Sequence, residues 1–245
     1  MAAPLLAIDG VSKRFGGVQA LNGLSFEVYP GEIVSLIGPN GAGKTTLFNV
    51  ATGFSRADAG RVTFDGRDVT RDSPEAICRA GLVRTFQASR VFPRMTVIRN
   101  VMVGALSWAS GLKEAERAAR QVFDHFGSRL HEYAERRVGT LSFANRRRAE
   151  IARALACRPK LLALDEPTAG MNPTETREIM DLIRKLRDGG LTILVIEHDM
   201  TLVMGVSDRI VVVDHGELLT TGRPDEVRTN TRVIEAYLGR ERDGS

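Results

Sequence analysis

The residues with the clearest chemical meaning form a glycine-rich loop between a predicted strand and a predicted helix. The segment GPNGAGKT at 38–45 fits the pattern G-x-x-x-x-G-K-[ST], with IVSLI before it and TLFNV after it. Glycines let successive backbone N–H groups turn toward phosphate oxygens, and the helix N-terminus adds a positive dipole. We expect Lys44 to reach the β- and γ-phosphates and Thr45 to bind Mg²⁺. The predicted phosphate-binding residues are Gly38, Pro39, Asn40, Gly41, Ala42, Gly43, Lys44, Thr45 and Thr46.

A second motif is an apolar strand that ends in two adjacent carboxylates. It reads LLALDE at 161–166. Because successive side chains of a strand point to opposite faces, Asp165 and Glu166 face different groups. We expect Asp165 to hold the Mg²⁺ shell and Glu166 to act on the attacking water as general base. A solvated acidic turn is the alternative, but phosphoryl transfer beside a phosphate loop needs a second partner for the metal.

Three single residues extend this candidate site, and each has a structural alternative. Gln87, in the segment RTFQ, is able to bond both the metal shell and the attacking water; alone it reads as a surface residue. His198 follows the strand TILVI, at a position where open α/β sheets bind ligands, and is able to donate to the γ-phosphate. Phe15 precedes a Gly-Gly pair and offers an apolar face to adenine; the alternative is a packed edge aromatic.

The elements that must position these residues alternate between strands and helices, which predicts an α/β fold. Strand patterns lie at 5–10, 24–28, 33–37, 62–64, 160–164, 192–196 and 209–213. Helical patterns lie at 44–52, 97–106, 113–126, 142–156, 173–187, 199–206 and 231–238. No convincing strand lies within 88–157, so we interpret this segment as a helical insertion that makes a second lobe.

Composition narrows the functional classes. The chain has 245 residues, 43% of them hydrophobic and 26% charged, enough for one large domain or two small ones. A membrane span needs about twenty apolar residues, and the apolar runs here are far shorter, so we expect no span and a cytosolic location. Cys78 and Cys157 read as reduced thiols rather than a disulfide framework or metal site. The net charge of +4 favours no partner class.

Over nearly the whole chain the motifs, in content and order, resemble an ABC-type ATPase. The resemblance implies a P-loop NTPase (RecA-like) core with an antiparallel β subdomain and an inserted helical subdomain. It divides the chain into a nucleotide-binding lobe at 1–87 and 158–245 and a helical lobe at 88–157. It also implies ATP and Mg²⁺ as cofactors. The implied catalytic residues are Glu166, His198, Gln87 and Lys44; the implied metal-binding residues are Thr45, Asp165 and Gln87; Phe15 resembles the adenine-stacking aromatic.

The segment LSFAN at 141–145 occupies the place of the family signature, usually LSGGQ. In the family two subunits pack head to tail, which implies that Ser142 binds the γ-phosphate of ATP held by the second subunit. Phe143 and Ala144 replace the signature glycines. We expect a side chain at Ala144 to limit the close approach of the second subunit, and so to weaken the dimer that holds ATP between the two subunits. Asn172 stands where aspartate is usual in the following loop, which predicts altered coupling between subunits.

A finer resemblance points to the ATPases of branched-chain amino-acid importers. The segments VFPRMTV at 91–97, IEHDM at 196–200 and the C-terminal 221–239 carry it. It implies separate transmembrane permease subunits, a second ATPase subunit, a solute-binding protein, and a peripheral location on the cytoplasmic face of the membrane. We expect 91–96 to contact the membrane partner, unless it is only a helix-capping loop.

Other functions remain as alternatives. ATPases of lipopolysaccharide or other lipid export share some of the same segments, and a soluble ABC-type ATPase acting on nucleic acid is a further possibility. The chain lacks the long coiled coils, zinc motifs and second ATPase domain of such soluble members, so we expect no nucleic-acid partner. An ordinary P-loop kinase or GTPase is disfavoured by the signature-like segment, Gln87 and His198.

Overall fold

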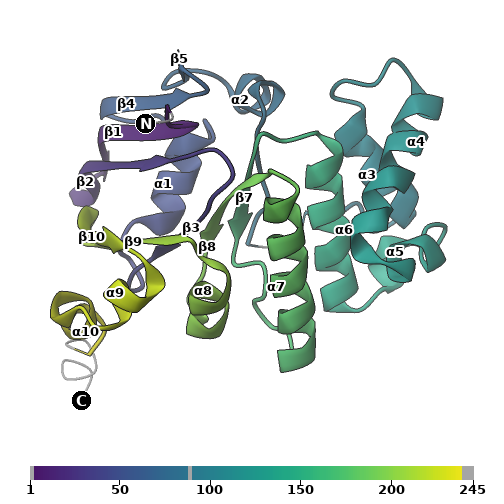
Figure 1. The fold of residues 1–245 in the computed structure, drawn as a ribbon. Coiled ribbons are helices and arrows are strands. Elements are labelled where there is room, and N and C mark those ends of the chain that lie inside the picture. Colours follow the sequence, from purple (N-terminus) through teal and green to yellow (C-terminus); the bar gives the residue numbers. More distant parts are fainter. Residues whose placement is uncertain (1–2, 88–89, 239–245) are drawn as a thin grey trace.

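The strands of the computed structural model form two sheets, and the helices between residues 97 and 156 are grouped together on one side (Figure 1). The structure describes residues 3–87 and 90–238. The predicted lobe boundary at Ala88 therefore lies outside the described residues. Within those residues a six-stranded sheet carries the order β10-β9-β3-β8-β7-β6 and a four-stranded sheet the order β2-β1-β4-β5.

The larger sheet is mostly parallel. Its strands are β3 (Ile33–Ile37), β6 (Leu82–Arg84), β7 (Leu161–Asp165), β8 (Thr192–Ile196), β9 (Arg209–Asp214) and β10 (Glu217–Gly222). Strands β9, β3, β8, β7 and β6 run parallel, and β10 pairs antiparallel with β9. Every residue of β3, β7 and β8 is buried, which explains their nearly continuous apolar sequences.

Helices cover both faces of this sheet. The helices outside the helical lobe are α1 (Lys44–Ala51), α2 (Pro74–Ala80), α7 (Pro173–Asp188), α8 (Met200–Val206), α9 (Pro224–Arg228) and α10 (Thr231–Leu238). Leu36 of β3 packs in one apolar cluster with Phe48 of α1. Ile33 of the same strand packs in another cluster, with Ile183 of α7 and Leu202 of α8. Strand alternation thus separates the two cores.

The smaller sheet is antiparallel and packs against the α1 side. Its strands are β1 (Leu6–Phe15), β2 (Val18–Val28), β4 (Ala59–Phe64) and β5 (Arg67–Asp68). Their buried residues, including Leu6, Leu24 and Phe64, belong to the same apolar cluster as Phe48 of α1. The two sheets therefore share one core, with α1 between them in Figure 1.

Between β6 and β7 the described residues form helices, with one isolated bridge between Thr96 and Arg137. These helices, here called the helical lobe, are α3 (Val97–Ala105), α4 (Leu112–Phe123), η1 (Asp124–Phe126), α5 (Ser128–Glu132), η2 (Val138–Thr140) and α6 (Phe143–Ala156). They enclose a core of their own around Phe123. Helices α3 and α6 lie very close, because a Cβ on Gly104 would stand 2.0 Å from the carbonyl oxygen of Arg153.

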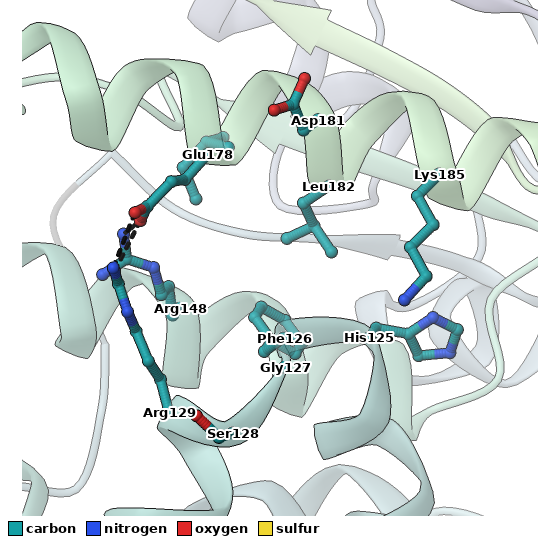
Figure 2. A pocket seen from close by; sticks show the side chains of 11 residues that line it. His125, Phe126, Gly127, Ser128, Arg129, Arg148, Glu178, Asp181, Leu182 and Lys185 are labelled. Carbon is teal, nitrogen blue, oxygen red and sulfur yellow. Dashed lines mark hydrogen bonds and ion pairs between the residues drawn. The ribbon is translucent and has the colours of Figure 1, made fainter.

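A cluster of ion pairs joins the helical lobe to α7 (Figure 2). Arg129 of α5 donates in bidentate fashion to Glu178, with Nη1–Oε2 at 2.6 Å and Nη2–Oε1 at 2.7 Å. Arg148 of α6 also pairs with Glu178. Beside this cluster lies a pocket of about 380 Å³, which extends along α7 to Lys185. Helix α6, which follows the signature-like segment and is called the signature helix below, and helix α5 are therefore tied to α7 at Glu178.

The sequence patterns locate the long elements well, and they miss the short ones. The predicted strands at 33–37 and 192–196 match β3 and β8, and the predicted mixed fold is confirmed. The predicted helix 113–126 is instead α4 followed by the 3₁₀ turn η1. Strands β5, β6 and β10 and helices α2, α5 and α9 were not predicted. Among residues 3–87 and 90–238, no helix combines the length and the apolarity that a membrane crossing requires.

Candidate functional site

The sheet brings four loops to one edge. Strands β3, β8, β7 and β6 are parallel neighbours, so the segments that follow them emerge side by side at their carboxyl ends. Strand β3 leads into the glycine-rich loop, β8 into His198, β7 into Glu166 and β6 into Gln87. Ligands of open α/β sheets bind at this edge. The sheet order thus groups residues that the sequence analysis took from four separate motifs.

The glycine-rich loop is a tight turn that leads into α1. Gly43 caps the helix with φ 101°, and a Cβ on it would stand 2.5 Å from the carbonyl oxygen of Ala20. A Cβ on Gly38 would stand 2.0 Å from the carbonyl oxygen of Val213. Both positions therefore require glycine, for conformation and for space. Of the predicted phosphate-binding residues, the buried ones are Gly38, Pro39 and Ala42, the half-buried ones Gly43, Lys44 and Thr46, and the exposed ones Asn40, Gly41 and Thr45.

Lys44 folds over its own loop. Its Nζ donates to the carbonyl oxygens of Gly38 at 2.6 Å and Pro39 at 2.9 Å. The ammonium group therefore lies against the turn whose N–H groups and helix dipole favour an anion. A phosphate held by this loop would meet a positive charge already in place.

Asp165 is buried at the end of β7 and paired with Arg84 of β6. The Arg84 Nη2 to Asp165 Oδ2 distance is 2.9 Å, and both side chains are almost fully buried. Burial raises the pKa of the Asp165 carboxyl, and the Arg84 charge and hydrogen bond oppose that rise. Arg84 also donates to Asn49 Oδ1 at 2.7 Å and stacks over Phe86, with its Cζ 4.8 Å from the ring centroid.

Glu166, Gln87 and His198 meet at the sheet edge. Gln87 Nε2 donates to Glu166 Oε2 at 2.9 Å. His198 Nδ1 lies 3.8 Å from Glu166 Oε1, and its side chain is largely exposed. Glu166 has φ 45°, a left-handed conformation that costs a non-glycine residue about 1–2 kcal/mol. Backbone strain of this kind is typical of functional positions.

Two buried charged residues of α6 also reach this edge, and the sequence analysis assigned them no role. Arg147 is 0% exposed, and its guanidinium donates to carbonyl oxygens of residues on both sides of the site. Glu150, one turn later, accepts from the backbone N–H of Phe86 at 3.3 Å and pairs with Arg147 Nη1 at 3.0 Å. The signal in the sequence was a pair of opposite charges three residues apart on the face of α6 that also carries Ile151 and Ala154.

Glu197 is a further functional candidate that the sequence analysis did not single out. It is buried directly before His198 and joins the loops after β7 and β8. One carboxylate oxygen accepts from Thr168 N at 3.1 Å and Thr168 Oγ1 at 2.5 Å. The other accepts from the backbone N–H of His198 at 2.9 Å and of Asp199 at 3.2 Å. Glu197 therefore sets the path of the chain that presents His198.

Phe15 and Ser142 lie on elements other than the four loops at the sheet edge. Phe15 ends β1 and is 52% exposed, with the Lys13 Nζ 5.3 Å from its ring centroid. It pairs with Val18 of β2, a short distance along the strand from Ala20, whose carbonyl borders Gly43. Ser142 is exposed and caps α6, with Oγ accepting from Asn145 N at 3.4 Å. In Figure 1 α6, which belongs to the helical lobe, and α1 lie on different sides of the strands β7 and β8.

The signature-like segment presents an aromatic side chain. Phe143 is 46% exposed, and a Cβ on Gly170 would lie 3.7 Å from its ring. Ala144 is only 2% exposed, so its methyl group faces the interior of the chain. We expected Ala144 to limit close approach to a second subunit. The structure corrects that expectation, because the exposed group beside Ser142 is Phe143.

Asn172 caps α7 where the family usually has aspartate. Its Oδ1 accepts from Thr174 N and Glu175 N, each at 3.0 Å. Glu175 Oε2 accepts in return from the Asn172 N–H at 3.1 Å, which completes a capping box. Asparagine therefore does the capping work of aspartate at this position without its charge.

The donor set at the edge fits Mg²⁺. Thr45 and Gln87 offer neutral oxygens and Asp165 a carboxylate, and Mg²⁺ is usually held by one or two protein oxygens with phosphate oxygens and water. No three His, Cys, Asp or Glu side chains gather as a closed metal cage in the described part of the chain. A metal that arrives with a nucleotide suits this arrangement better than a resident ion.

Known proteins match the chain along its length. Residues 21–169 match the family model for the ABC transporter, and 217–243 match that for the branched-chain amino acid ATP-binding cassette transporter. The chain is 45% identical to the high-affinity branched-chain amino acid transport ATP-binding protein LivG of Escherichia coli, with 98% of this chain and 99% of that protein covered. It is 43% identical to BraF of Pseudomonas aeruginosa, named for the same transport, at the same coverage.

Solved structures agree with this. A nucleotide-free ATP-binding cassette from an ABC transporter superposes with a TM-score of 0.87 at 32% identity, over 96% of this chain and 99% of that one. An ADP-bound cassette of an ABC transporter also gives 0.87 at 32% identity, over 97% and 100%. With the phosphate loop, the paired carboxylates and the sheet order, these matches show that the chain belongs to the ABC transporter family of ATP-binding cassettes.

Proposed function

We propose that the chain binds ATP with Mg²⁺ at the carboxyl edge of its large sheet and hydrolyses it to drive import of branched-chain amino acids through separate membrane subunits. One observation carries the catalytic part. Gln87 and His198 converge on Glu166 at the edge that also holds the phosphate loop. The transport part is supported by the relatives, which are named for branched-chain amino acid transport at 43–46% identity.

Each residue at the edge has a distinct task in this proposal. The phosphate loop and Lys44 hold the β- and γ-phosphates. Thr45, Asp165 and Gln87 would hold Mg²⁺, which when bound would neutralise charge on the triphosphate. Glu166 accepts the proton of the attacking water, Gln87 orients that water, and His198 donates a hydrogen bond to the γ-phosphate as negative charge develops.

Two further groups complete the nucleotide site. Phe15 stacks on adenine, which suits its exposed ring beside the phosphate loop. Ser142 of a second ATPase subunit contacts the γ-phosphate, because within one chain Ser142 sits on α6 in the helical lobe. The exposed N-terminus of α6 supports this head-to-tail arrangement, since a helix N-terminus attracts phosphate.

The membrane subunit docks on the helical lobe in this proposal. A groove of about 450 Å³ lies along α3 and α4, and its lining includes Met95, Ile98, Met102, Leu106 and Leu112. The exposed ring of Phe92 lies in the predicted contact segment 91–96. An amphipathic helix of the permease fits such an apolar groove. Docking there places the chain at the cytoplasmic face of the membrane, beneath subunits that receive solute from a solute-binding protein.

The catalytic proposal is tested with Glu166→Gln. The variant keeps the shape of the side chain but removes the proton acceptor, so ATP binding persists and turnover falls by about a hundredfold or more. Lys44→Ala lowers nucleotide affinity instead, measured by titration with a fluorescent ATP analogue. Undiminished ATPase activity in Glu166→Gln would remove Glu166 from its proposed role.

The transport proposal needs a separate test. The chain is co-purified from membranes, its permease partners are identified, and the complex is reconstituted in vesicles with ATP inside. ATP-dependent uptake of radiolabelled leucine into the vesicles, with the binding protein outside, supports import. Movement of a lipid, or no membrane partner at all, would contradict it.

A further inference from the structure

Arg147 is a buried residue of α6 whose guanidinium reaches the carboxyl edge of the large sheet and donates to carbonyl oxygens of three residues there. Its Nη1 donates to the carbonyl oxygen of Phe86 at 2.6 Å. Its Nη2 donates to the carbonyl oxygens of Gln87 at 2.9 Å and Glu166 at 3.1 Å. A single planar guanidinium therefore holds the main chain of Gln87 and of Glu166, the two residues whose side chains are hydrogen-bonded to each other.

The charge of Arg147 is balanced where it lies. Glu150 accepts from Arg147 Nη1 at 3.0 Å, and both side chains are at most 1% exposed. The other oxygen of Glu150 accepts from the N–H of Phe86 at 3.3 Å and of Arg90 at 3.4 Å. The main chain around Gln87 is therefore hydrogen-bonded to both members of the pair. Arg147 donates to its carbonyl groups, and Glu150 accepts from its N–H groups on either side of Gln87. Arg147 Nε has no hydrogen-bond partner among the described residues. The orientation of the guanidinium therefore satisfies Nη1 and Nη2, which donate to the carbonyl oxygens, at the expense of Nε.

The bond to Glu166 matters because of the conformation of that residue. Glu166 has φ 45° and precedes Pro167, a combination that most residues avoid. Its N–H donates to the carbonyl oxygen of Ile196 at 2.9 Å, and its own carbonyl accepts from Arg147. Both peptide groups that flank the Glu166 side chain are therefore fixed by partners, one on β8 and the other on α6.

Arg147 also stands close to the signature-like segment. Ser142 caps α6, and Arg147 lies on the second turn of the same helix. A rigid helix of this length moves as one body, with about 1.5 Å of rise per residue. A displacement of the N-terminus of α6 therefore moves the guanidinium that holds Gln87 and Glu166.

We propose that Arg147 is a positioning residue, which fixes the main chain of Gln87 and Glu166 for hydrolysis and transmits the position of the signature helix to them. This inference rests on the proposed catalytic role of Glu166. Arg147 touches no reacting atom in it; it acts through the orientation of the Glu166 carboxylate and the Gln87 amide. Loss of Arg147 thus lowers the rate of the chemical step while the phosphate loop continues to bind ATP.

The test compares variants of the full chain by steady-state ATPase kinetics. Arg147→Lys keeps the charge beside Glu150 but loses the planar fork that reaches several carbonyls. We expect kcat to fall by about tenfold to a hundredfold, as for a small misplacement of a catalytic group, with KM for ATP changed by less than about threefold. The double variant Arg147→Met with Glu150→Gln removes both buried charges, so it avoids an unpaired charge in the core.

The double variant separates positioning from folding. A protein with wild-type thermal stability and ATP affinity but low kcat supports the proposal; recovery of wild-type kcat would overturn it, as would a wild-type kcat in Arg147→Lys. The matched control is Arg153→Gln, on the same helix, whose guanidinium donates to the Arg90 carbonyl at 2.7 Å. We expect its kcat within about twofold of wild type. If Glu166→Gln retains activity, the proposed function fails first; if only the Arg147 variants retain it, this inference alone fails.

Discussion

Gln87 Nε2 and Glu166 Oε2 are joined by a hydrogen bond of 2.9 Å, although the two residues follow different strands of the sheet. Strands β6 and β7 pair in parallel register, with Arg84 opposite Ala163, so their carboxyl ends lie together. The side chains of the two residues that we propose orient the attacking water and accept its proton are thus hydrogen-bonded to each other. The geometry of this pair depends on the main chain beneath it.

Gln87→Glu is expected to lower hydrolysis more than Gln87→Ala does. The Gln87 amide donates to Glu166 Oε2 at 2.9 Å, and a carboxylate in its place would repel the Glu166 carboxylate instead of bonding to it. We expect Gln87→Ala to lower kcat by about tenfold and Gln87→Glu to lower it further. The kcat values of both variants are measured at saturating ATP; a Gln87→Glu variant that is as active as wild type would contradict the arrangement.

Phe143→Gly strengthens the ATP-bound dimer. The Phe143 side chain is exposed beside Ser142, whereas Ala144 is buried, so in the proposed head-to-tail dimer Phe143 rather than Ala144 would face the second subunit. In a Glu166→Gln background, which retains ATP, sedimentation gives the dimer dissociation constant. We expect it to fall with Phe143→Gly. Ala144→Gly serves as the comparison: it leaves dimerisation unchanged and costs α6 about 1 kcal/mol of stability. The reverse ranking would restore Ala144 as the obstacle.

The parts of the fold and of the candidate site that the sequence predicts are those whose pattern lies within one short segment of the chain. The phosphate loop and the strand that ends in Asp165 are contiguous, and a glycine pattern or an apolar run identifies them directly. The meeting of Gln87, Glu166 and His198 follows from strand order, which no single segment encodes. Motif order and family resemblance supplied it instead.

The buried charged residues Arg147 and Glu150 are the main part of the candidate site that the sequence did not predict. Arg147 sits in a run of arginines and Glu150 on an ordinary-looking helix, and most helical charges are solvated. Only the packing of α6 against the loops after β6 and β7 makes them interior. Strand β10 escaped prediction for the opposite reason: it is an edge strand with no buried residue, so it lacks an apolar face.

Glu178→Gln weakens the junction of the helical lobe with α7. Arg148 is buried and pairs with Glu178, so neutralising the acid leaves a buried charge whose remaining side-chain hydrogen bond among the described residues is to Asn145 Oδ1, at 2.7 Å. We expect the free energy of unfolding in urea to fall by about 2 kcal/mol. Asp181→Asn, which breaks the exposed pair with Arg184, should cost less than about 0.5 kcal/mol. An equal fall in the free energy of unfolding in the two variants would show that the Glu178 ion pairs stabilise the chain no more than an exposed ion pair does.

Cys78 reacts as a thiolate near neutral pH. A hydrogen bond with the Cys157 thiol lowers the pKa of Cys78 to about 7, while that bond and burial raise the pKa of Cys157. The thiolate fraction grows as pH rises, so alkylation of Cys78 by iodoacetamide accelerates through pH 7 and Cys157 stays unreactive. In Cys157→Ala the midpoint moves toward about 8.5, the ordinary thiol value. Mass spectrometry of the two peptides measures both rates; a wild-type midpoint already at the ordinary value would refute the pairing.

The close approach of α3 and α6 at Gly104 has a mechanical consequence. The Gly104 backbone stands against the Arg153 carbonyl with no space for even a methyl group, so the two helices have no room to slide past each other. A push delivered to α3 by whatever binds the groove along it therefore reaches Ser142 and Arg147 with little slack. If a membrane subunit docks on α3 as proposed, the close contact at Gly104 would transmit its displacement to α6 as a rigid movement instead of absorbing it.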